Sequence, residues 1–378
     1  MSEPDPPRRF DFGIILAVLI VSSAAATLFL VHGIATAWNV VAEKWDGIYY
    51  YYIALNGYVS QGYGGEAKFS FLPGYSILLI PATRLLPSAP FLASFLTSSA
   101  LTATGGALLY RLLRSSLRQW PSLAAIALLA FSPFAIYLYD GYAEAALFAC
   151  VAGALLCLHS RRILGAAALA GFALICRPHA IALLPLFAVP GWRLLRTRQI
   201  FKLGLTITLI STPFILYAIY MLHLTGDSLI IAKRLTMWTR YGVIAQAWPI
   251  GTKILYSFYY SFREGGPNVW ALSLGMFFLS WAATLKTVDK IPAELLAYGL
   301  LTLAFVFVTD ALVPLNLGRH SMAAFTIGPA LAACIYPRTR QHMGARVANH
   351  LCFISVLLVF VAMFVMMAQR FSLGQWVS

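Results

Sequence analysis

The amino-acid sequence predicts an all-α polytopic membrane protein. Of its 378 residues, 60% are hydrophobic and only 11% are charged, whereas about 25% are charged in soluble domains. The mean hydropathy is +0.78. The apolar runs are long and continuous, which is typical of membrane helices and not of barrel strands, whose residues alternate. These three observations exclude a soluble enzyme and a transmembrane β-barrel.

The charge balance and the cysteines also fit a membrane protein. A net charge of +14 would indicate nucleic-acid binding in a soluble chain. In a membrane protein it reflects loop cations that set the topology, so we expect no nucleic-acid partner. The five cysteines all lie in apolar runs and form no C-x-x-C pair. Neither a zinc site nor a disulfide framework is therefore indicated.

Eleven apolar runs are predicted to span the membrane. The first run lacks a closing site of small residues and is interpreted as a retained span instead of a cleaved signal peptide. Several of the others are short. In chain order the runs are 13–37, 88–110, 121–138, 141–158, 163–175, 180–192, 203–224, 267–285, 292–309, 320–336 and 350–369.

The run 71–86 is predicted to lie on the membrane surface as an interfacial helix. It has about 16 residues, is interrupted by Pro73 and carries Arg84. With this run outside the membrane and the N-terminus in the cytoplasm, 16 of the 27 Lys and Arg residues fall in the short inner loops, as the positive-inside rule requires. Two long outer loops follow, about 38–87 and 225–266, within one integral membrane domain over 1–378.

Asp46 is the strongest candidate for chemistry. Burying an unpaired charge near a membrane is costly, and Asp46 follows the first span by about ten residues. In a helix, Asp46, Tyr49 or Tyr50, and Ile53 share one face. The carboxylate is either a catalytic base or an ordinary helix cap. The neighbouring aromatics, among them Trp45, are either interface anchors or platforms for a sugar.

Three further polar clusters lie at predicted outer turns. Glu144 either pairs with an arginine or lines a polar cavity. Arg177 is either a snorkelling cation, a salt-bridge partner of Glu144 or Asp140, or a phosphate contact. Arg319 and His320 present the same choice at a third turn.

Several of these residues belong to stretches that resemble the PIG-V family and its prokaryotic relatives, mannosyltransferases that add the second mannose in glycosylphosphatidylinositol assembly. The chain departs from the family at Ala143 and His179, where the family has serine and asparagine. The matching stretches, in order, are Trp45-Asp46, Ile53-Ala54, Gly57-Tyr58, Glu66-x-x-Phe69-Ser70-Phe71-Leu72-Pro73-Gly74-Tyr75, Ser132-Pro133, Gly141-Tyr142-Ala143-Glu144-Ala145 and Arg177-Pro178-His179-Ala180.

The resemblance implies a GT-C-type bundle of about 11 transmembrane helices with juxtamembrane helices in the first outer loop. It implies transfer of a hexose, mannose in the family, from a polyprenyl-phosphate donor to a lipid-linked or glycan acceptor, with inversion. Asp46 is then the base. Donor phosphate contacts are assigned to Arg177, Arg319 or His320. The remaining predicted substrate-binding residues are Trp45, Tyr49, Glu66, Lys68, Asp140, Glu144 and His179, with Lys233, Arg234 and Arg240 as further cation candidates for the phosphate.

No cofactor is required by this interpretation. The sequence has no glycine-rich nucleotide loop, as expected if the donor is already in the membrane. A divalent cation, Mg or Mn, is compatible with the chemistry, although no ligand spacing indicates one.

Two other function classes stay open at this stage: a transporter or lipid flippase, and a structural subunit. Acids on one face of the membrane and the lack of repeated halves speak against transport. Compact loops and the short chain favour a prokaryotic inner membrane, with the site on its outer face.

Overall fold

The structure is a computed structural model, and it describes residues 12–35, 46–59, 65–228, 230, 269, 271–310, 319–337 and 343–373. Within these ranges every regular element is helical. The side chains of 32–35, 65–67 and 308–310 fall outside the description. The prediction of an all-α fold is confirmed for this part of the chain.

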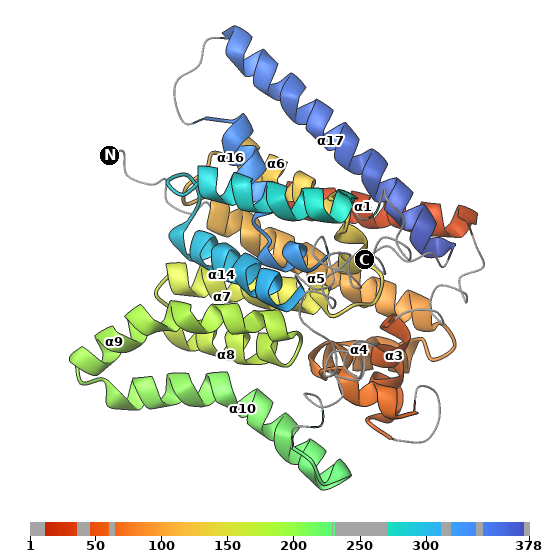
Figure 1. Ribbon diagram of the computed structural model, residues 1–378, viewed down its shortest axis with the longest axis vertical. Helices are drawn as coiled ribbons and strands as arrows, with labels where there is room; N and C mark the ends of the chain where they lie inside the picture. The colour runs from red at the N-terminus through yellow and green to blue at the C-terminus, as the bar shows by residue number, and fades with distance from the viewer. Residues whose placement is uncertain are drawn as a thin grey trace, which may run out of the picture.

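Long-range packing places α5 at the centre of the bundle, where it packs against both α1 and α7 (Figure 1). Helix α8 packs on the other side of α7, and α6 packs against α1. The small residues of α7 and α8 let these helices approach closely, as in other membrane bundles. The bounds are Phe12–Ala35 for α1, Pro90–Leu113 for α5, Gln119–Ala130 for α6, Glu144–His159 for α7 and Ile163–Leu174 for α8.

The remaining helices surround this centre. Helix α10 packs on α8, and α17 runs across the opposite side of the bundle beside α1 (Figure 1). Helix α14 packs against the 3-10 helix η3. The bounds are Pro178–Phe187 for η3, Ala188–Arg196 for α9, Ile200–Thr225 for α10, Ala293–Asp310 for α14 and Met343–Ser372 for α17, and a further helix covers Ala271–Lys286.

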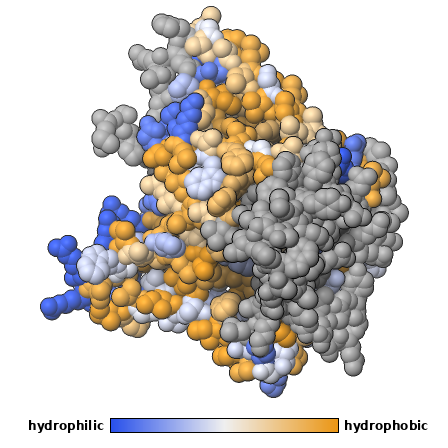
Figure 2. Space-filling view, in the orientation of Figure 1, coloured by the Kyte–Doolittle hydropathy of each residue, from blue (hydrophilic) through white to orange (hydrophobic). Residues whose placement is uncertain are grey.

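Five helical segments of the described chain are long and apolar enough to cross a membrane, and five further apolar helices are shorter. Together they correspond to ten of the eleven predicted spans. The coloured part of the surface in Figure 2 is mostly hydrophobic, and the turn between α9 and α10 is one of the places where hydrophilic residues gather. Arg193, Arg196 and Arg198 are exposed there. The chain is an integral membrane protein.

The predicted span 121–138 ends early. Helix α6 stops at Ala130, and a buried connection over 131–143 follows, with the short 3-10 helix η2 (Ala135–Leu138) inside it. Pro133 explains the break, because its ring would clash with the carbonyl of residue 129 in a continued helix. The predicted span 141–158 likewise begins later, at Glu144, because Gly141 has a φ of +80°, outside the helical region.

The predicted span 320–336 is wrong as a single helix. A turn of helix at 319–321 leads into η4 (Met322–Ala324), and α16 (Ile327–Ile335) starts afresh. Phe325 has a φ of +52°, which a helix does not allow. Pro329 accounts for the break, since it fits in the first turn of α16 but would clash with the carbonyl of Phe325 in an unbroken helix.

Three short helices lie at one end of the bundle (Figure 1). They are α3 (Gly47–Asn56), the 3-10 helix η1 (Gly65–Ser70) and α4 (Gly74–Leu85). Helix α3 packs on α4, and α4 packs on α5. The predicted run 71–86 is helical over Gly74–Leu85, and its place on the membrane surface stays a prediction.

Candidate active site

Two glycines bring the connection 131–143 against the start of α3. A Cβ atom on Gly47 would lie 3.2 Å from the carbonyl oxygen of Asp140. A Cβ on Gly141 would lie 2.8 Å from the Cβ of Ser94 on α5. Because neither position leaves room for a side chain, the backbones approach closely. This contact holds Asp46 beside the turn that leads into Glu144.

A third glycine fixes the position of Arg177. The N–H of Gly74 donates a hydrogen bond of 2.7 Å to the carbonyl of Ile175, and a Cβ on Gly74 would lie 2.7 Å from that same oxygen. The start of α4 therefore docks on the end of α8. Arg177 itself is extended, with φ −151° and ψ 144°, as expected for the residue before Pro178.

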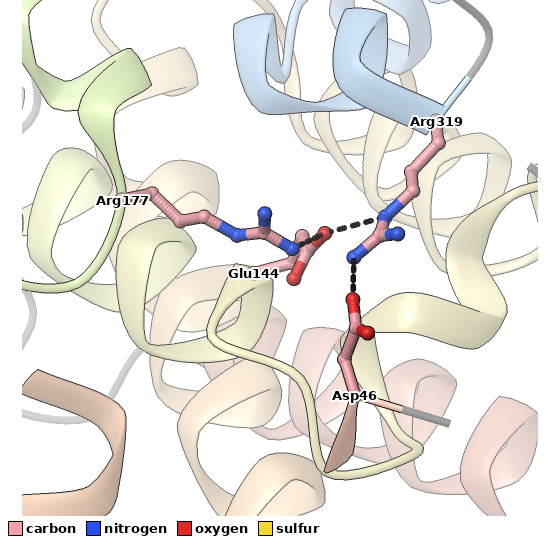
Figure 3. Close-up of polar contacts among 4 residues, drawn as sticks. All are labelled: Asp46, Glu144, Arg177 and Arg319. Atoms are coloured by element: carbon pink, nitrogen blue, oxygen red, sulfur yellow. Dashed lines mark hydrogen bonds and ion pairs between the residues drawn. The ribbon is translucent and has the colours of Figure 1, made fainter. Parts of the chain in front are cut away.

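Four charged side chains from these segments form one network (Figure 3). Glu144 Oε1 accepts hydrogen bonds from Arg177 Nη2 and, at 2.9 Å, from Arg319 Nε. Arg319 Nη2 lies 3.9 Å from Asp46 Oδ2. Glu144 and Arg319 are 5% and 6% exposed. Two acids balance two arginines, which is how buried charges are tolerated.

Two tyrosines contact Arg319. Its guanidinium carbon lies 4.2 Å from the ring centroid of Tyr137 and 4.7 Å from that of Tyr142. Both distances are in the range of a cation–π interaction.

Three buried polar atoms of the network have no hydrogen-bond partner among the described residues. They are Glu144 Oε2, Arg177 Nε and Arg319 Nη2. Buried polar atoms without partners are rare in folded proteins. Their chemistry, two cationic donors and one acceptor, suits a ligand that carries both an anionic group and a hydroxyl group. The Asp46 side chain is 33% exposed, so the network is accessible from the side of Asp46.

Burial raises the pKa of Asp46 above the ordinary value of an aspartate, although Arg319 and Arg177 act in the opposite direction. A carboxylate with a raised pKa binds a proton more strongly than an ordinary one, which suits a general base.

Three other predicted site residues, His179, His320 and Tyr49, make contacts between rings. The rings of His179 and His320 have centroids 4.8 Å apart, and His179 also contacts Phe305 at 5.6 Å. Each histidine is close in sequence to an arginine of the network. Tyr49 stacks on Phe71 at 4.8 Å, so this ring packs on the chain that precedes α4.

The rest of the predicted set is partly outside the description. Lys68 is buried in η1 and Asp140 is buried in the connection 131–143. The residues that fall outside the described part are Trp45, the side chain of Glu66, and Lys233, Arg234 and Arg240. Among the described residues, no group of three or more His, Cys, Asp or Glu side chains could hold a metal ion.

Sequence reasoning missed the two tyrosines on Arg319. Tyr142 lies in the matching stretch Gly141–Ala145, but no role was assigned to it. Tyr137 lies inside the predicted span 121–138. The signal that could have found them is the spacing of Tyr137, Asp140, Tyr142 and Glu144 around Gly141, a polar and aromatic pattern that a lipid-facing helix does not need.

Comparison with known proteins connects this geometry to a fold. A family model described as dolichyl-phosphate-mannose-protein mannosyltransferase matches residues 75–217, which include Glu144 and Arg177. The archaeal oligosaccharyltransferase AglB from Archaeoglobus fulgidus, solved with an inhibitory peptide and a dolichol-phosphate, aligns with a TM-score of 0.52 and 11% identity over 93% of this chain and 56% of that chain. The chain has the GT-C fold.

A second structure of an Archaeoglobus fulgidus oligosaccharyltransferase, in complex with Zn and sulfate, aligns with a TM-score of 0.52 and 12% identity over 93% of this chain and 53% of that chain. Apo ArnT from Cupriavidus metallidurans gives a TM-score of 0.45, 13% identity, and 94% and 75% coverage. The chain thus spans about half the length of the oligosaccharyltransferases. Among curated proteins no significant match was found. The PIG-V resemblance stays a prediction.

Proposed function

We propose that the protein is a membrane glycosyltransferase that moves a hexose, mannose in the first instance, from a polyprenyl-phosphate donor to a lipid-linked or glycan acceptor. The observation that carries this proposal is the network itself: a partly exposed carboxylate, Asp46, lies 3.9 Å from the Nη2 of the buried Arg319, and this Nη2 has no hydrogen-bond partner among the described residues. A base and a phosphate-binding cation are thus adjacent, as glycosyl transfer from a phosphate requires.

The proposed step is a single displacement. The acceptor oxygen bonds to the anomeric carbon of the sugar, and its proton passes to Asp46. The bond between that carbon and the phosphate oxygen breaks, and the electron pair leaves with the polyprenyl phosphate. Arg319 and Arg177 stabilise the departing phosphate through Nη2 and Nε, two buried donors without a hydrogen-bond partner among the described residues. One displacement inverts the anomeric configuration.

Glu144 has two tasks in this proposal. Its Oε1 holds both arginines, which orients their free N–H groups. Its Oε2 is a buried acceptor without a hydrogen-bond partner among the described residues, and we assign it to a sugar hydroxyl. His179, His320 and Lys68 are assigned to the donor head group as further cations, and Asp140, Trp45, Tyr49 and Glu66 to the sugar.

The similarities support the donor class. The family model that matches 75–217 is described by dolichyl-phosphate-mannose, and AglB was solved with a dolichol-phosphate. We further propose that the N-terminus is cytoplasmic and that the site opens on the outer face of a prokaryotic inner membrane, where the donor reaches it from the lipid. A divalent cation, Mg or Mn, is compatible with this site and is not needed by the step above.

The test is transfer by membranes of cells that express the protein, which supply native acceptors. Membranes receive radiolabelled polyprenyl-phosphate mannose, or GDP-mannose in parallel, and other polyprenyl-phosphate hexoses complete the panel. We expect a labelled product from a polyprenyl donor and none from the nucleotide sugar once endogenous donor synthesis is blocked. Movement of labelled lipid between leaflets without any product would contradict the transferase proposal and indicate a flippase.

A further inference from the structure

We propose that Tyr137 and Tyr142, with Phe371 behind them, form an aromatic clamp that sets the position of Arg319 and keeps its Nη2 available for the donor phosphate. This inference rests on the proposed function and adds three positioning residues to it. The clamp is defined by these three rings, and none of them is assigned a direct contact with the substrate.

The rings form a corner, and the guanidinium of Arg319 lies in it. The centroids of Tyr137 and Tyr142 are 5.0 Å apart, with planes at 85°. Each tyrosine also contacts Phe371 edge-on, with ring centroids 6.1 Å apart for Tyr137 and 6.2 Å apart for Tyr142. The tyrosines come from the connection 131–143 and Phe371 from the end of α17, so segments far apart in the sequence meet at one cation. Tyr142 and Phe371 are each 2% exposed.

Arg319 needs such support. An arginine side chain loses rotamer entropy when it is held in one place. Glu144 accepts a hydrogen bond from the Nε of Arg319, whereas Asp46, at the other end of the guanidinium, lies 3.9 Å from Nη2, beyond hydrogen-bond distance. A carboxylate in full hydrogen-bond contact at that end would hold the guanidinium more firmly, but it would also occupy the N–H groups that a phosphate needs.

Aromatic faces avoid this conflict. The electron-rich face of a tyrosine ring attracts a cation, yet it leaves the N–H groups at the edge of the guanidinium unoccupied. Accordingly, Nη2 has no hydrogen-bond partner among the described residues and lies on the side of Asp46 (Figure 3). The clamp therefore positions the cation without competing with an anionic ligand.

The test compares Tyr142→Leu with Tyr142→Phe in purified full-length protein in nanodiscs. The probes are binding of a radiolabelled polyprenyl phosphate and transfer from polyprenyl-phosphate mannose. We expect Tyr142→Leu to bind the polyprenyl phosphate at least tenfold more weakly and to raise the KM of the donor, because the ring face is lost. Tyr142→Phe keeps the face, and its binding should stay within about threefold of the wild type. We expect the same difference in polyprenyl-phosphate binding between Tyr137→Leu and Tyr137→Phe.

The pH profile supplies a readout that loss of packing alone would not move. The charges that act on Asp46 are Arg319, Arg177, Glu144 and His320. When Arg319 is no longer held near Asp46, one of the influences that lower the pKa of Asp46 weakens. The acidic limb of kcat/KM should therefore move to higher pH in Tyr142→Leu and stay in place in Tyr142→Phe.

A double-mutant cycle with Arg319→Ala separates the outcomes. If the clamp acts through Arg319, adding Tyr142→Leu to Arg319→Ala costs less than threefold more. Full additivity, or equal losses in the Leu and Phe variants, would overturn the clamp. Wild-type binding by Arg319→Ala would overturn the phosphate role of Arg319 and the clamp with it. Loss in Arg319→Ala together with wild-type behaviour of Tyr142→Leu would overturn the clamp alone.

A remote variant keeps the proposal testable if Tyr142→Leu does not fold. Phe371→Leu removes the ring behind both tyrosines and preserves most of the side-chain volume, and it leaves the four charged residues of the network unchanged. We expect a loss of polyprenyl-phosphate binding of about threefold with the same direction of shift in the pH profile. Unchanged binding and an unchanged profile in folded Phe371→Leu would remove Phe371 from the clamp and contradict the proposal as stated.

Discussion

Helix α7 carries an ion pair at each end, and the two pairs are built differently. At its start, Glu144 is 5% exposed and binds two arginines from other segments. At its end, the ring of His159 lies 3.3 Å from Glu294 of α14, with side chains 37% and 30% exposed. The 16 residues of α7 place the two pairs about 24 Å apart.

The difference supports the proposal that the chemistry takes place at the start of α7. The acid at the start of α7 suits the helix dipole, and a histidine in the last turn does so when it is protonated. Only the first pair incurs the desolvation cost of burial, which a stable fold alone does not require. Among the described residues, the chain around that end is also broken, at Pro133, Gly141, Pro178 and Phe325. The regular, exposed end is ordinary surface.

Asp46→Asn should have the largest effect on the buried end. The amide keeps the shape of the side chain and cannot accept a proton, so we expect transfer from polyprenyl-phosphate mannose to fall by about 10²–10⁴-fold. Binding of a radiolabelled polyprenyl phosphate should persist, because both arginines remain. Turnover at the wild-type rate by the folded variant would remove Asp46 from the role of base.

Glu144→Ala should reduce both stability and transfer. It leaves Arg177 and Arg319 buried without the carboxylate that joins them, and breaking a buried ion pair costs about 3–5 kcal/mol. The unfolding midpoint in detergent measures this loss. Glu144→Gln, which keeps an acceptor oxygen, should lose less stability. Equal, near wild-type midpoints for both variants would show that the network is not held by this carboxylate.

Gly74→Ala tests the close contact that positions Arg177. The new Cβ would meet the carbonyl oxygen of Ile175 at 2.7 Å, so α4 or the end of α8 must shift, at a cost of about 1–3 kcal/mol. Transfer should fall, because Arg177 moves with the turn. Gly204→Ala is the matched control, since nothing lies within 4 Å of a Cβ there and alanine favours a helix. Similar behaviour of the two variants would contradict the docking role.

The helices and the charged residues of the candidate site could be predicted from the sequence. Hydropathy located the helices of the described chain because burial in lipid needs continuous apolar runs. It missed the breaks after Ala130 and at Phe325, because a window of apolar residues averages over one proline. Asp46, Glu144, Arg177 and Arg319 could be named because charge is rare in such a chain.

What the sequence could not give is how these residues meet. The contact between Gly74 and Ile175 joins positions about 100 apart in the chain, and no local pattern encodes it. Tyr137 could not be told from a lipid-facing aromatic, since both occur in apolar runs. The assignment of one shared partner, Glu144, to two arginines likewise depends on tertiary packing.

The pH dependence of transfer should reflect the environment of Asp46. The base must be deprotonated, and its pKa is raised by burial. As the pH falls, activity should therefore be lost at a higher pH than the value near 3.9 of an ordinary aspartate. In Arg319→Ala the residual activity should be lost at a still higher pH, because Arg319 lowers this pKa. An acidic limb at the ordinary value in the wild type would argue against Asp46 as a base with a raised pKa.

His159→Ala, at the exposed end of α7, should have the smallest effect. Solvent screens this pair, and exposed ion pairs contribute about 0–1 kcal/mol. The unfolding midpoint should change little, and added salt should reduce even that change. Transfer should be the same as in the wild type, because about 24 Å of regular helix separates His159 from the network. A tenfold loss of transfer would mean that α7 couples its two ends, and the contrast between a buried functional end and an exposed structural end would no longer hold.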